Sequence, residues 1–282
     1  MPEGDSIFRT ARALNRALGG RIVTGFETTL AKLASVDDQS PITGRTVERV
    51  EARGKWCLIF FSGDLILLTH MRMSGSWHLY KTGERWQTPR SEMRVVITCG
   101  EVQAVGFSIP VAEFHTARSL ERSAHMSELG MDVLGTAYRV DEAVHALRDY
   151  GRAHPDAEIG NALLNQHVIA GIGNIYKSEI AFAAGVNPFR RMQTTTDREL
   201  ERIAEIACHY MRANVAEGNG KGIMTFTGAL STTGTMDRRA RLWVYRRQGQ
   251  ECRRCGAIIE MRRQGTGARS TYWCPSCQPY IG

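Results

Sequence analysis

The sequence predicts a multidomain α+β protein, with an N-terminal helix and β-sandwich or barrel, a helical middle domain and a small cysteine-rich unit at the end. Residues 21–115 hold several short segments rich in β-forming residues, and helical periodicity takes over after about residue 120. Four cysteines then gather near the C-terminus. We therefore expect three domains, spanning residues 1–122, 123–237 and 238–282.

The first predicted element is an amphipathic helix over residues 5–18. Its apolar residues recur on one face, Asp5 or Ser6 is placed to cap its start, and Gly19-Gly20 is placed to end it. Strand-like segments separated by turn signals follow, over residues 47–50, 56–61, 65–69, 76–80, 94–99 and 102–107. Short strands at such close spacing indicate a sandwich or a barrel.

The middle of the chain has a helical pattern punctuated by Gly and Pro. The candidate helices span residues 140–150, 157–166, 174–184 and 196–217. Residues 218–237, which follow them, are rich in Gly, Thr and Ser and are expected to form an exposed loop.

The composition favours a polyanionic partner. The net charge is +7, and residues 238–263 hold nine arginines against two acidic residues, Glu251 and Glu260. Clustered arginine can replace the counterions that condense on a phosphate backbone. The longest apolar runs, Trp56–Phe61 and Leu65–Leu68, are far too short to span a bilayer, and charged residues interrupt any N-terminal signal core. We therefore expect a cytoplasmic protein of a bacterium-like cell.

Four of the seven cysteines form two C-x2-C pairs, Cys252 with Cys255 and Cys274 with Cys277. Two such pairs can complete a tetrahedral thiolate site, which favours one structural Zn²⁺ ion with no open position for catalysis. Disulfides, disfavoured in the cytoplasm, and an iron–sulfur centre are the alternatives. The sequence between the pairs predicts a β-hairpin with a basic tip at residues 265–269. The other cysteines are expected to be small buried hydrophobic residues: Cys57, Cys99 and Cys208.

The N-terminus offers a possible nucleophile. A small second residue such as Pro2 permits removal of Met1, which would leave a free secondary amine on Pro2. An α-amine has an ordinary pKa of about 7.7–8.0, so part of it is neutral and nucleophilic at neutral pH. Such an amine can attack an electrophilic sugar carbon and form an iminium, and Glu3 stands beside it as a possible acid and base. A Met-Pro start also occurs in many proteins without any catalytic role.

Several motifs occur together in one order along the chain. They are Met1-Pro2-Glu3-Gly4, Arg53-Gly54-Lys55, His70-Met71-Arg72-Met73-Ser74-Gly75-Ser76, Gly171-Ile172-Gly173-Asn174-Ile175-Tyr176 and the two cysteine pairs. This set resembles the formamidopyrimidine-DNA glycosylase/endonuclease VIII family over essentially the full length. The resemblance implies an N-terminal catalytic β-sandwich, a helix–two-turns–helix DNA-binding domain with a flexible loop, and a C-terminal β-hairpin zinc finger.

The resemblance also implies a function, that of a bifunctional DNA glycosylase and abasic-site lyase of base excision repair. Pro2 matches the family's nucleophile, and Glu3 matches the general acid/base that assists opening of the sugar ring. Lys55 matches the active-site lysine that contacts phosphate beside the lesion, and Arg269 matches the zinc-finger arginine that grips the same phosphates. The strand would be cut by β,δ-elimination, without a redox or small-molecule cofactor.

Two further residues are expected to contact DNA. Asn174 matches the family's phosphate-binding asparagine, in a Gly-rich turn that exposes backbone N–H groups at a helix N-terminus. Met73 aligns with the loop that fills the gap left by an extruded nucleotide. A methionine buried at a strand end is the alternative for Met73. The expected partner is damaged double-stranded DNA, bound by a monomer that is associated with the nucleoid and not with a membrane.

Sequence details favour the endonuclease VIII branch and oxidised pyrimidines. Purine-preferring members carry an Arg-x-Phe pair that is missing from residues 107–114 here, and Gly4 also points to the endonuclease VIII branch. Ser6 stands where the family usually has glutamate, which leaves efficiency and lesion range open. The alternatives are an oxidised-purine glycosylase acting on 8-oxoguanine or formamidopyrimidine, a catalytically silent damaged-DNA-binding protein, and a zinc-finger RNA-binding protein.

Overall fold

The computed structural model describes residues 2–216, 223–226 and 241–281. The chain forms two compact units, Met1–Glu128 and Leu129–Gly282. The finer division at residues 122 and 237 stays a prediction. Among the described residues, no helix combines the length and the apolar character needed to cross a membrane.

The first unit begins with α1 (Gly4–Leu18), which is the helix expected over residues 5–18. The predicted cap at Asp5 or Ser6 is wrong, because the N-cap is Glu3. Ser6 is the third helical residue, and its hydroxyl accepts from the Glu3 N–H at 2.9 Å and donates to the Glu3 carbonyl at 2.8 Å. The helix ends at Gly19 as expected. Its buried apolar stripe is Ile7, Ala11, Leu14 and Leu18.

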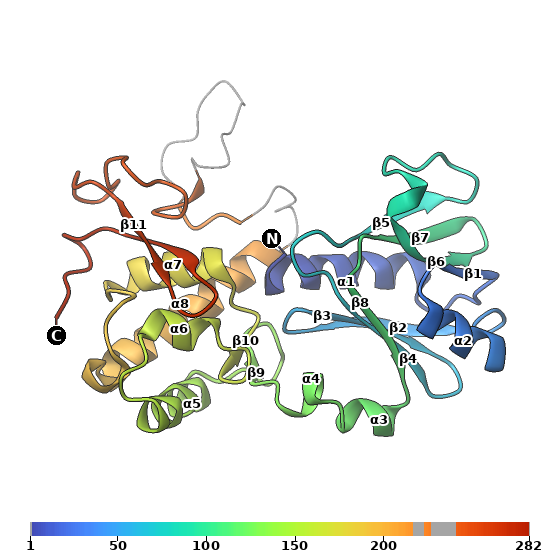
Figure 1. Ribbon diagram of the computed structural model, residues 1–282, viewed down its shortest axis with the longest axis horizontal. Coiled ribbons are helices and arrows are strands. Elements are labelled where there is room, and N and C mark those ends of the chain that lie inside the picture. Colours follow the sequence, from blue (N-terminus) through green and yellow to red (C-terminus); the bar gives the residue numbers. More distant parts are fainter. Residues whose placement is uncertain (1, 217–222, 227–240, 282) are drawn as a thin grey trace. The chain divides into compact units, whose positions relative to one another are not determined.

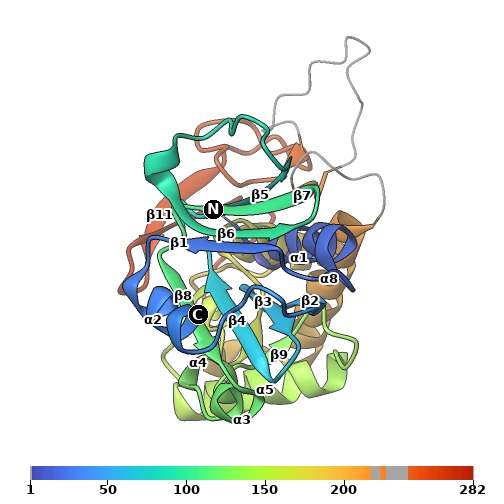
Figure 2. The same ribbon diagram turned by 90° about the vertical axis from the view of Figure 1, so that its right-hand side faces the viewer.

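The strands of the first unit form two four-stranded antiparallel sheets, shown in Figure 2. One sheet has the order β1-β6-β7-β5 and the other β2-β3-β4-β8. The bounds are β1 (Gly25–Thr28), β2 (Val47–Arg53), β3 (Trp56–Phe61), β4 (Leu65–His70), β5 (Ser76–Lys81), β6 (Met93–Cys99), β7 (Val102–Phe107) and β8 (Val111–His115). All six predicted strands are present, and β1 and β8 are additional.

The two sheets share one hydrophobic core, which makes the unit a sandwich. Ile59 and Leu67 of one sheet and Val95 and Ile97 of the other belong to it, together with the buried face of α1. On the outer face of β3 and β4, Leu58 and Leu68 pack against Leu120. The remaining elements of this unit are α2 (Ala31–Gln39), the 3-10 turn η1 (Arg90–Glu92), α3 (Ala117–Glu121) and α4 (Ala124–Ser127).

In the described residues of the second unit, four α-helices form the frame, and Figure 1 labels them. They are α5 (Val140–Ala153), α6 (Ile159–Leu164), α7 (Asn174–Ala184) and α8 (Asp197–Val215), close to the four predicted ranges. The short strands β9 (Met131–Asp132) and β10 (Ile169–Ala170) pair in parallel, and η2 (Met192–Thr194) precedes α8. Tyr176 and Ile180 of α7 lie in the core of this unit with Leu200 and Ile203 of α8.

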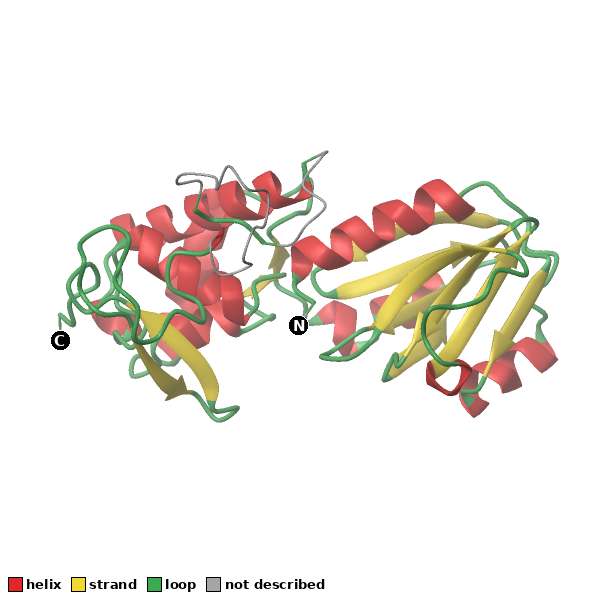
Figure 3. Cartoon of the chain, turned by 90° about the horizontal axis from the view of Figure 1, so that it is seen from above, coloured by secondary structure: helices red, strands yellow, loops and turns green. Residues whose placement is uncertain are grey.

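The C-terminal segment is a hairpin of β11 (Glu260–Gln264) and β12 (Arg269–Trp273), as the sequence predicted (Figure 3). Gly265 opens the turn with a φ of +67°, a left-handed conformation that glycine adopts without steric cost. The predicted loop over residues 218–237 lies outside the described residues, except for 223–226.

Candidate active site and DNA-binding surface

Pro2 and Glu3 stand at the positive end of α1. Glu3 is fully buried, Pro2 is half-buried, and the Ser6 hydroxyl bridges the backbone N–H and carbonyl of Glu3. Ser6 therefore fixes the backbone that carries Glu3. Asp5 is also fully buried, with its Oδ2 2.9 Å from the Arg9 guanidinium. Burial raises the pKa of the Asp5 carboxyl.

Lys55 lies in the tight turn between β2 and β3, directly after Gly54, whose φ is +58°. The register of β3 and β4 pairs Trp56 with His70, which brings His70 close to this turn. Burial, followed by the positive charges of Lys55, Arg72 and His125, lowers the pKa of His70 to about 4. The end of β4 is therefore a cationic surface on which a neutral imidazole is favoured, and such a surface attracts an anion.

His70 begins the His70–Ser76 motif, but the sequence predicts no role for it. Its Nδ1 accepts the Arg72 backbone N–H at 3.0 Å, so it also shapes the loop that follows β4. A histidine at the end of a strand has no distinctive pattern. Only the pairing of β3 with β4 reveals that it neighbours Lys55.

The loop after β4 presents Met73 to solvent. Met71 is buried and its carbonyl accepts the Gly75 N–H at 2.8 Å, which closes a tight turn. Arg72 has a φ of +44°, and the Met73 residue is 67% exposed. The alternative of a core methionine is therefore wrong for Met73. A large apolar side chain held out on a braced turn suits insertion between bases.

Asn174 begins α7, directly after the Gly171-Ile172-Gly173 turn. Gln166 braces this turn, because its amide donates to the Ile172 carbonyl at 3.0 Å and accepts the Gly171 N–H at 3.0 Å. Asn174 Nδ2 donates to the Ser270 carbonyl of β12 at 2.9 Å. The structure therefore joins the helix N-terminus directly to the strand that carries Arg269.

Arg269 is exposed at the start of β12, beside the hairpin turn. The turn is held by the Arg263 guanidinium, which donates to the Ala268 carbonyl at 3.0 Å, and by the Ala268 N–H, which donates to the Gly265 carbonyl at 3.0 Å. Within the part of the chain that the structure describes, the Arg269 guanidinium has no hydrogen bond or ion pair. It is available to an external anion.

The four paired cysteines converge at the base of the hairpin. Their sulfur atoms all lie within 4.8 Å of one another, with 3.9 Å between Cys252 and Cys277 and 3.5 Å between Cys255 and Cys274. A tetrahedron with Zn–S bonds of about 2.3 Å has edges of about 3.8 Å, so the cluster is the right size for zinc. Cys57 and Cys99 are buried in the sandwich core, as expected, and Cys208 is partly buried.

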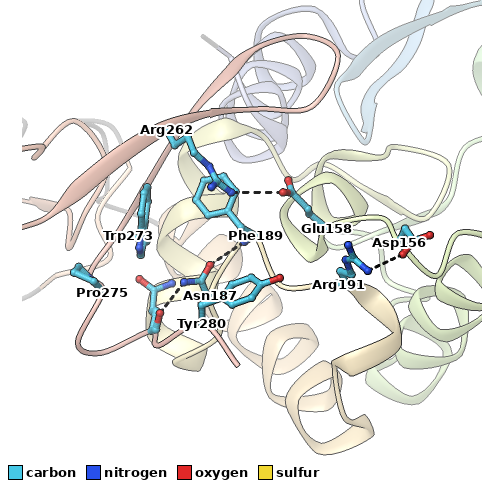
Figure 4. A pocket seen from close by; sticks show the side chains of 10 residues that line it. Asp156, Glu158, Asn187, Phe189, Arg191, Arg262, Trp273, Pro275 and Tyr280 are labelled. Atoms are coloured by element: carbon cyan, nitrogen blue, oxygen red, sulfur yellow. Dashed lines mark hydrogen bonds and ion pairs between the residues drawn. The ribbon is translucent and has the colours of Figure 1, made fainter. Parts of the chain in front are cut away.

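A pocket of about 550 Å³ flanks the hairpin on the second unit (Figure 4). The rings of Phe189 and Trp273 meet edge to face there, with 4.9 Å between their centroids. The Arg262 guanidinium carbon lies over the Phe189 ring, 3.6 Å from its centroid. Arg262 and Arg191 each have a carboxylate partner, Glu158 at 3.6 Å and Asp156 at 3.1 Å. Because its arginines are paired with acids, this pocket suits a DNA phosphate less well than the unpaired Arg269.

The fold, the four-cysteine cluster and the exposed cationic side chains indicate a class of protein, a zinc-finger protein with a surface suited to an anionic partner. Comparison with known families supports this class. The formamidopyrimidine-DNA glycosylase N-terminal domain matches residues 1–110, its H2TH domain matches residues 129–227, and the zinc finger found in these proteins and in isoleucyl-tRNA synthetase matches residues 249–279.

Relatives match over nearly the whole chain. A probable endonuclease 8 2 of Streptomyces coelicolor is 36% identical over 99% of this chain and 94% of its own length. The Mycolicibacterium smegmatis protein named DNA-(apurinic or apyrimidinic site) lyase Nei2 is 33% identical, with 99% of both chains covered. Endonuclease 8 of Salmonella dublin is 30% identical. The chain belongs to the formamidopyrimidine-DNA glycosylase/endonuclease VIII family, and the resemblance seen in the sequence is confirmed.

Solved structures confirm the fold. Lactococcus lactis formamidopyrimidine-DNA glycosylase, non-covalently bound to DNA with an abasic site, superposes with a TM-score of 0.79. The match covers 99% of this chain and 100% of that chain, at 20% identity. The same protein in complex with DNA that contains an oxidised pyrimidine superposes with a TM-score of 0.80.

Proposed function

We propose that this chain is a bifunctional DNA glycosylase and abasic-site lyase that removes oxidised bases in base excision repair. The observation that carries the proposal is the Pro2-Glu3 pair at the start of α1, in a chain whose full-length relatives include a named abasic-site lyase.

The reaction begins at the sugar carbon under the damaged base. The neutral Pro2 nitrogen forms a bond to C1′ as the bond between C1′ and the base breaks, and the base leaves with the proton that the Pro2 amine releases. Glu3 protonates the ring oxygen as the sugar opens, which leaves an iminium between Pro2 and C1′. Loss of a C2′ proton then expels the 3′ phosphate, and a second elimination expels the 5′ phosphate. Water then hydrolyses the iminium, which releases the unsaturated sugar remnant and frees the Pro2 amine, and a one-nucleoside gap with a phosphate at both ends is left in the DNA.

Three cationic or polar residues are proposed to hold DNA phosphate. Lys55 on the first unit and Asn174 and Arg269 on the second would each hold phosphate near the lesion. Extruding a nucleotide costs a few kcal/mol, which contacts of this kind can offset. Met73 would occupy the space that the extruded base leaves in the stack. The unpaired Arg269 guanidinium and the exposed Met73 side chain support these assignments.

One zinc ion is proposed to be held by Cys252, Cys255, Cys274 and Cys277. Four thiolates fill a tetrahedral shell, so the ion would stabilise the hairpin and take no part in the chemistry. The spread of sulfur distances around the expected tetrahedral edge supports this assignment.

Oxidised pyrimidines are the proposed substrates. The link between β7 and β8 is only the three residues 108–110, which leaves no loop for the Arg-x-Phe pair of purine-preferring relatives. The relatives named endonuclease 8 support the same branch. Oxidised purines are the second candidate. We further propose a monomer that acts on double-stranded DNA in the bacterial cytoplasm.

The test is a cleavage assay on labelled duplexes that contain an abasic site, an oxidised pyrimidine or 8-oxoguanine. The wild type should cut the first two, and Glu3→Gln should slow base removal by about 100-fold or more, because it removes an acid/base group. Glu205→Gln, an exposed change on α8, is the matched control. Binding of these duplexes without any cutting would replace the proposal with a silent damage-binding protein, and preferred excision of 8-oxoguanine would overturn the pyrimidine assignment.

A further inference from the structure

Lys177 is a fully buried lysine in α7, three residues after Asn174. Its ammonium nitrogen donates to the hydroxyl of Thr271 at 2.5 Å. Thr271 is also fully buried, and it lies in β12 two residues after Arg269. Lysine is almost never fully buried without a specific partner, because desolvating its charge costs free energy. This contact therefore needs an explanation.

The contact begins a directed chain of hydrogen bonds. An ammonium can only donate, so the Thr271 hydroxyl accepts from Lys177 and donates onward to Gln264 Oε1 at 2.9 Å. The Gln264 amide then donates to Glu158 Oε2 at 2.8 Å and to the Pro188 carbonyl at 2.8 Å. The Thr271 hydroxyl has a second, longer acceptor in the Arg269 carbonyl at 3.3 Å. These hydrogen bonds fix how both strands of the hairpin sit on the helices.

We propose that the Lys177–Thr271 hydrogen bond is a positioning device that sets the Arg269 guanidinium at its phosphate-binding place relative to Asn174. This inference rests on the proposed role of Arg269 and Asn174 in gripping phosphate. Two consecutive residues of β12 accept hydrogen bonds from α7, Ser270 from Asn174 and Thr271 from Lys177. Arg269 is the next residue along β12, where its backbone pairs with Gln264 and its carbonyl accepts the Thr271 hydroxyl at 3.3 Å. The contacts of Ser270 and Thr271 with α7 therefore set the position of the Arg269 backbone, whereas no hydrogen bond or ion pair among the described residues fixes its guanidinium.

A matched pair of variants isolates the hydrogen bond. Thr271→Val removes the hydroxyl but keeps the size and the β-branch, so it breaks the contacts with both Lys177 and Gln264. Thr271→Ser keeps the hydroxyl and loses only a methyl group. Zinc content and the unfolding midpoint are measured for both. If Thr271→Val does not fold, Lys177→Met, which removes the donor and fits a buried site, replaces it in the same experiment.

The readout is the dissociation constant for a duplex with a non-cleavable tetrahydrofuran abasic site. Thr271→Val should bind about tenfold more weakly than the wild type, because a displaced Arg269 would lose about one charge-assisted hydrogen bond to phosphate. The dissociation constant of Thr271→Ser should stay within about threefold of the wild-type value. The same changes are made in an Arg269→Ala background. In that background Thr271→Val should not change the dissociation constant further, because the hydrogen bond acts on binding only through the Arg269 side chain, which is absent.

The outcomes separate this inference from the proposed function. If Arg269→Ala alone leaves binding unchanged, the phosphate-gripping role of Arg269 fails. If Arg269→Ala weakens binding but Thr271→Val weakens it equally in both backgrounds, the role of Arg269 stands and the positioning role is overturned. Equal losses for Thr271→Val and Thr271→Ser would also overturn it, since packing and not the hydrogen bond would then be responsible.

Discussion

The buried carboxylate of Glu179 is predicted to contribute strongly to the stability of the second unit. This carboxylate in α7 is fully buried and accepts backbone N–H groups from Trp243 at 2.8 Å, Val244 at 2.9 Å and Tyr245 at 2.8 Å. The Thr225 hydroxyl also donates to it. One side chain therefore fastens the two described segments around it, residues 223–226 and the start of the zinc-finger segment, to α7.

Glu179→Gln keeps the shape and replaces one acceptor oxygen with an NH₂ group. Oε1 accepts two backbone N–H groups, whereas Oε2 accepts the Trp243 N–H and a hydroxyl that can rotate. The amide nitrogen should therefore take the Oε2 position, where it leaves the Trp243 N–H without an acceptor. That loss costs about 1–3 kcal/mol, and the two remaining bonds weaken when the charge is removed. We expect the variant to be about 3 kcal/mol less stable in total.

The assay is urea unfolding of the second unit together with hydrogen exchange of the Trp243, Val244 and Tyr245 amides. Glu205→Gln, exposed on α8, is the control and should leave both unchanged. The variant should lose stability and show faster exchange at these three amides. A loss below about 0.5 kcal/mol, which is typical of surface substitutions, would refute the reasoning.

Three further predictions follow from the site. The pKa of His70 is lowered to about 4 in the folded protein, so the unfolded chain binds a proton first as the pH falls from 6.5. The free energy of unfolding should therefore drop by about 1–2 kcal/mol as the pH falls from 6.5 to 4, after allowance for solvent screening. In urea unfolding measured against pH, His70→Gln should remove this drop, and an unchanged pH dependence would contradict the prediction. Gly265→Ala should weaken binding to abasic-site DNA and lower the unfolding midpoint, because Gly265 has a φ of +67° and an added Cβ would lie 2.6 Å from Asn161 Oδ1. Gly267→Ala is the control, and equal binding and midpoints for the two variants would argue against the prediction. Cys255→Ser should release zinc to a chelator faster than the wild type, and equal release would count against a four-thiolate site.

The sequence predicted the parts of the fold that have strong periodicity or turn signals. Three predictions were correct: the buried apolar face of α1, the six strands, and the grouping of the paired cysteines. Helix α2 was missed because Leu33 is its one fully buried residue, so the helix carries almost no amphipathic pattern. Strand β1 has four residues, none of them fully buried, and gave no alternation to detect.

Candidate site residues could be proposed from the sequence only where they lie in local motifs. Pro2, Glu3, Asn174 and Arg269 could be named from short patterns. The contact between Asn174 and Ser270 joins residues 96 positions apart, and only the tertiary fold reveals it. The buried charges of the second unit were invisible for another reason, since lysine and glutamate in a helix are normally exposed. Lys177 and Glu179 gave no sign of the polar networks that they anchor.

The central claim is that the Pro2 amine forms a covalent iminium with the sugar. Borohydride reduces such an iminium to a stable crosslink, so the protein is incubated with abasic-site DNA and borohydride, and the crosslinked peptide is identified by mass spectrometry. DNA should be attached at Pro2 in wild-type protein that lacks Met1. Pro2→Leu, whose large second residue retains Met1, should form far less crosslink. A crosslink at a lysine, or none with the wild type, would show that Pro2 is not the nucleophile.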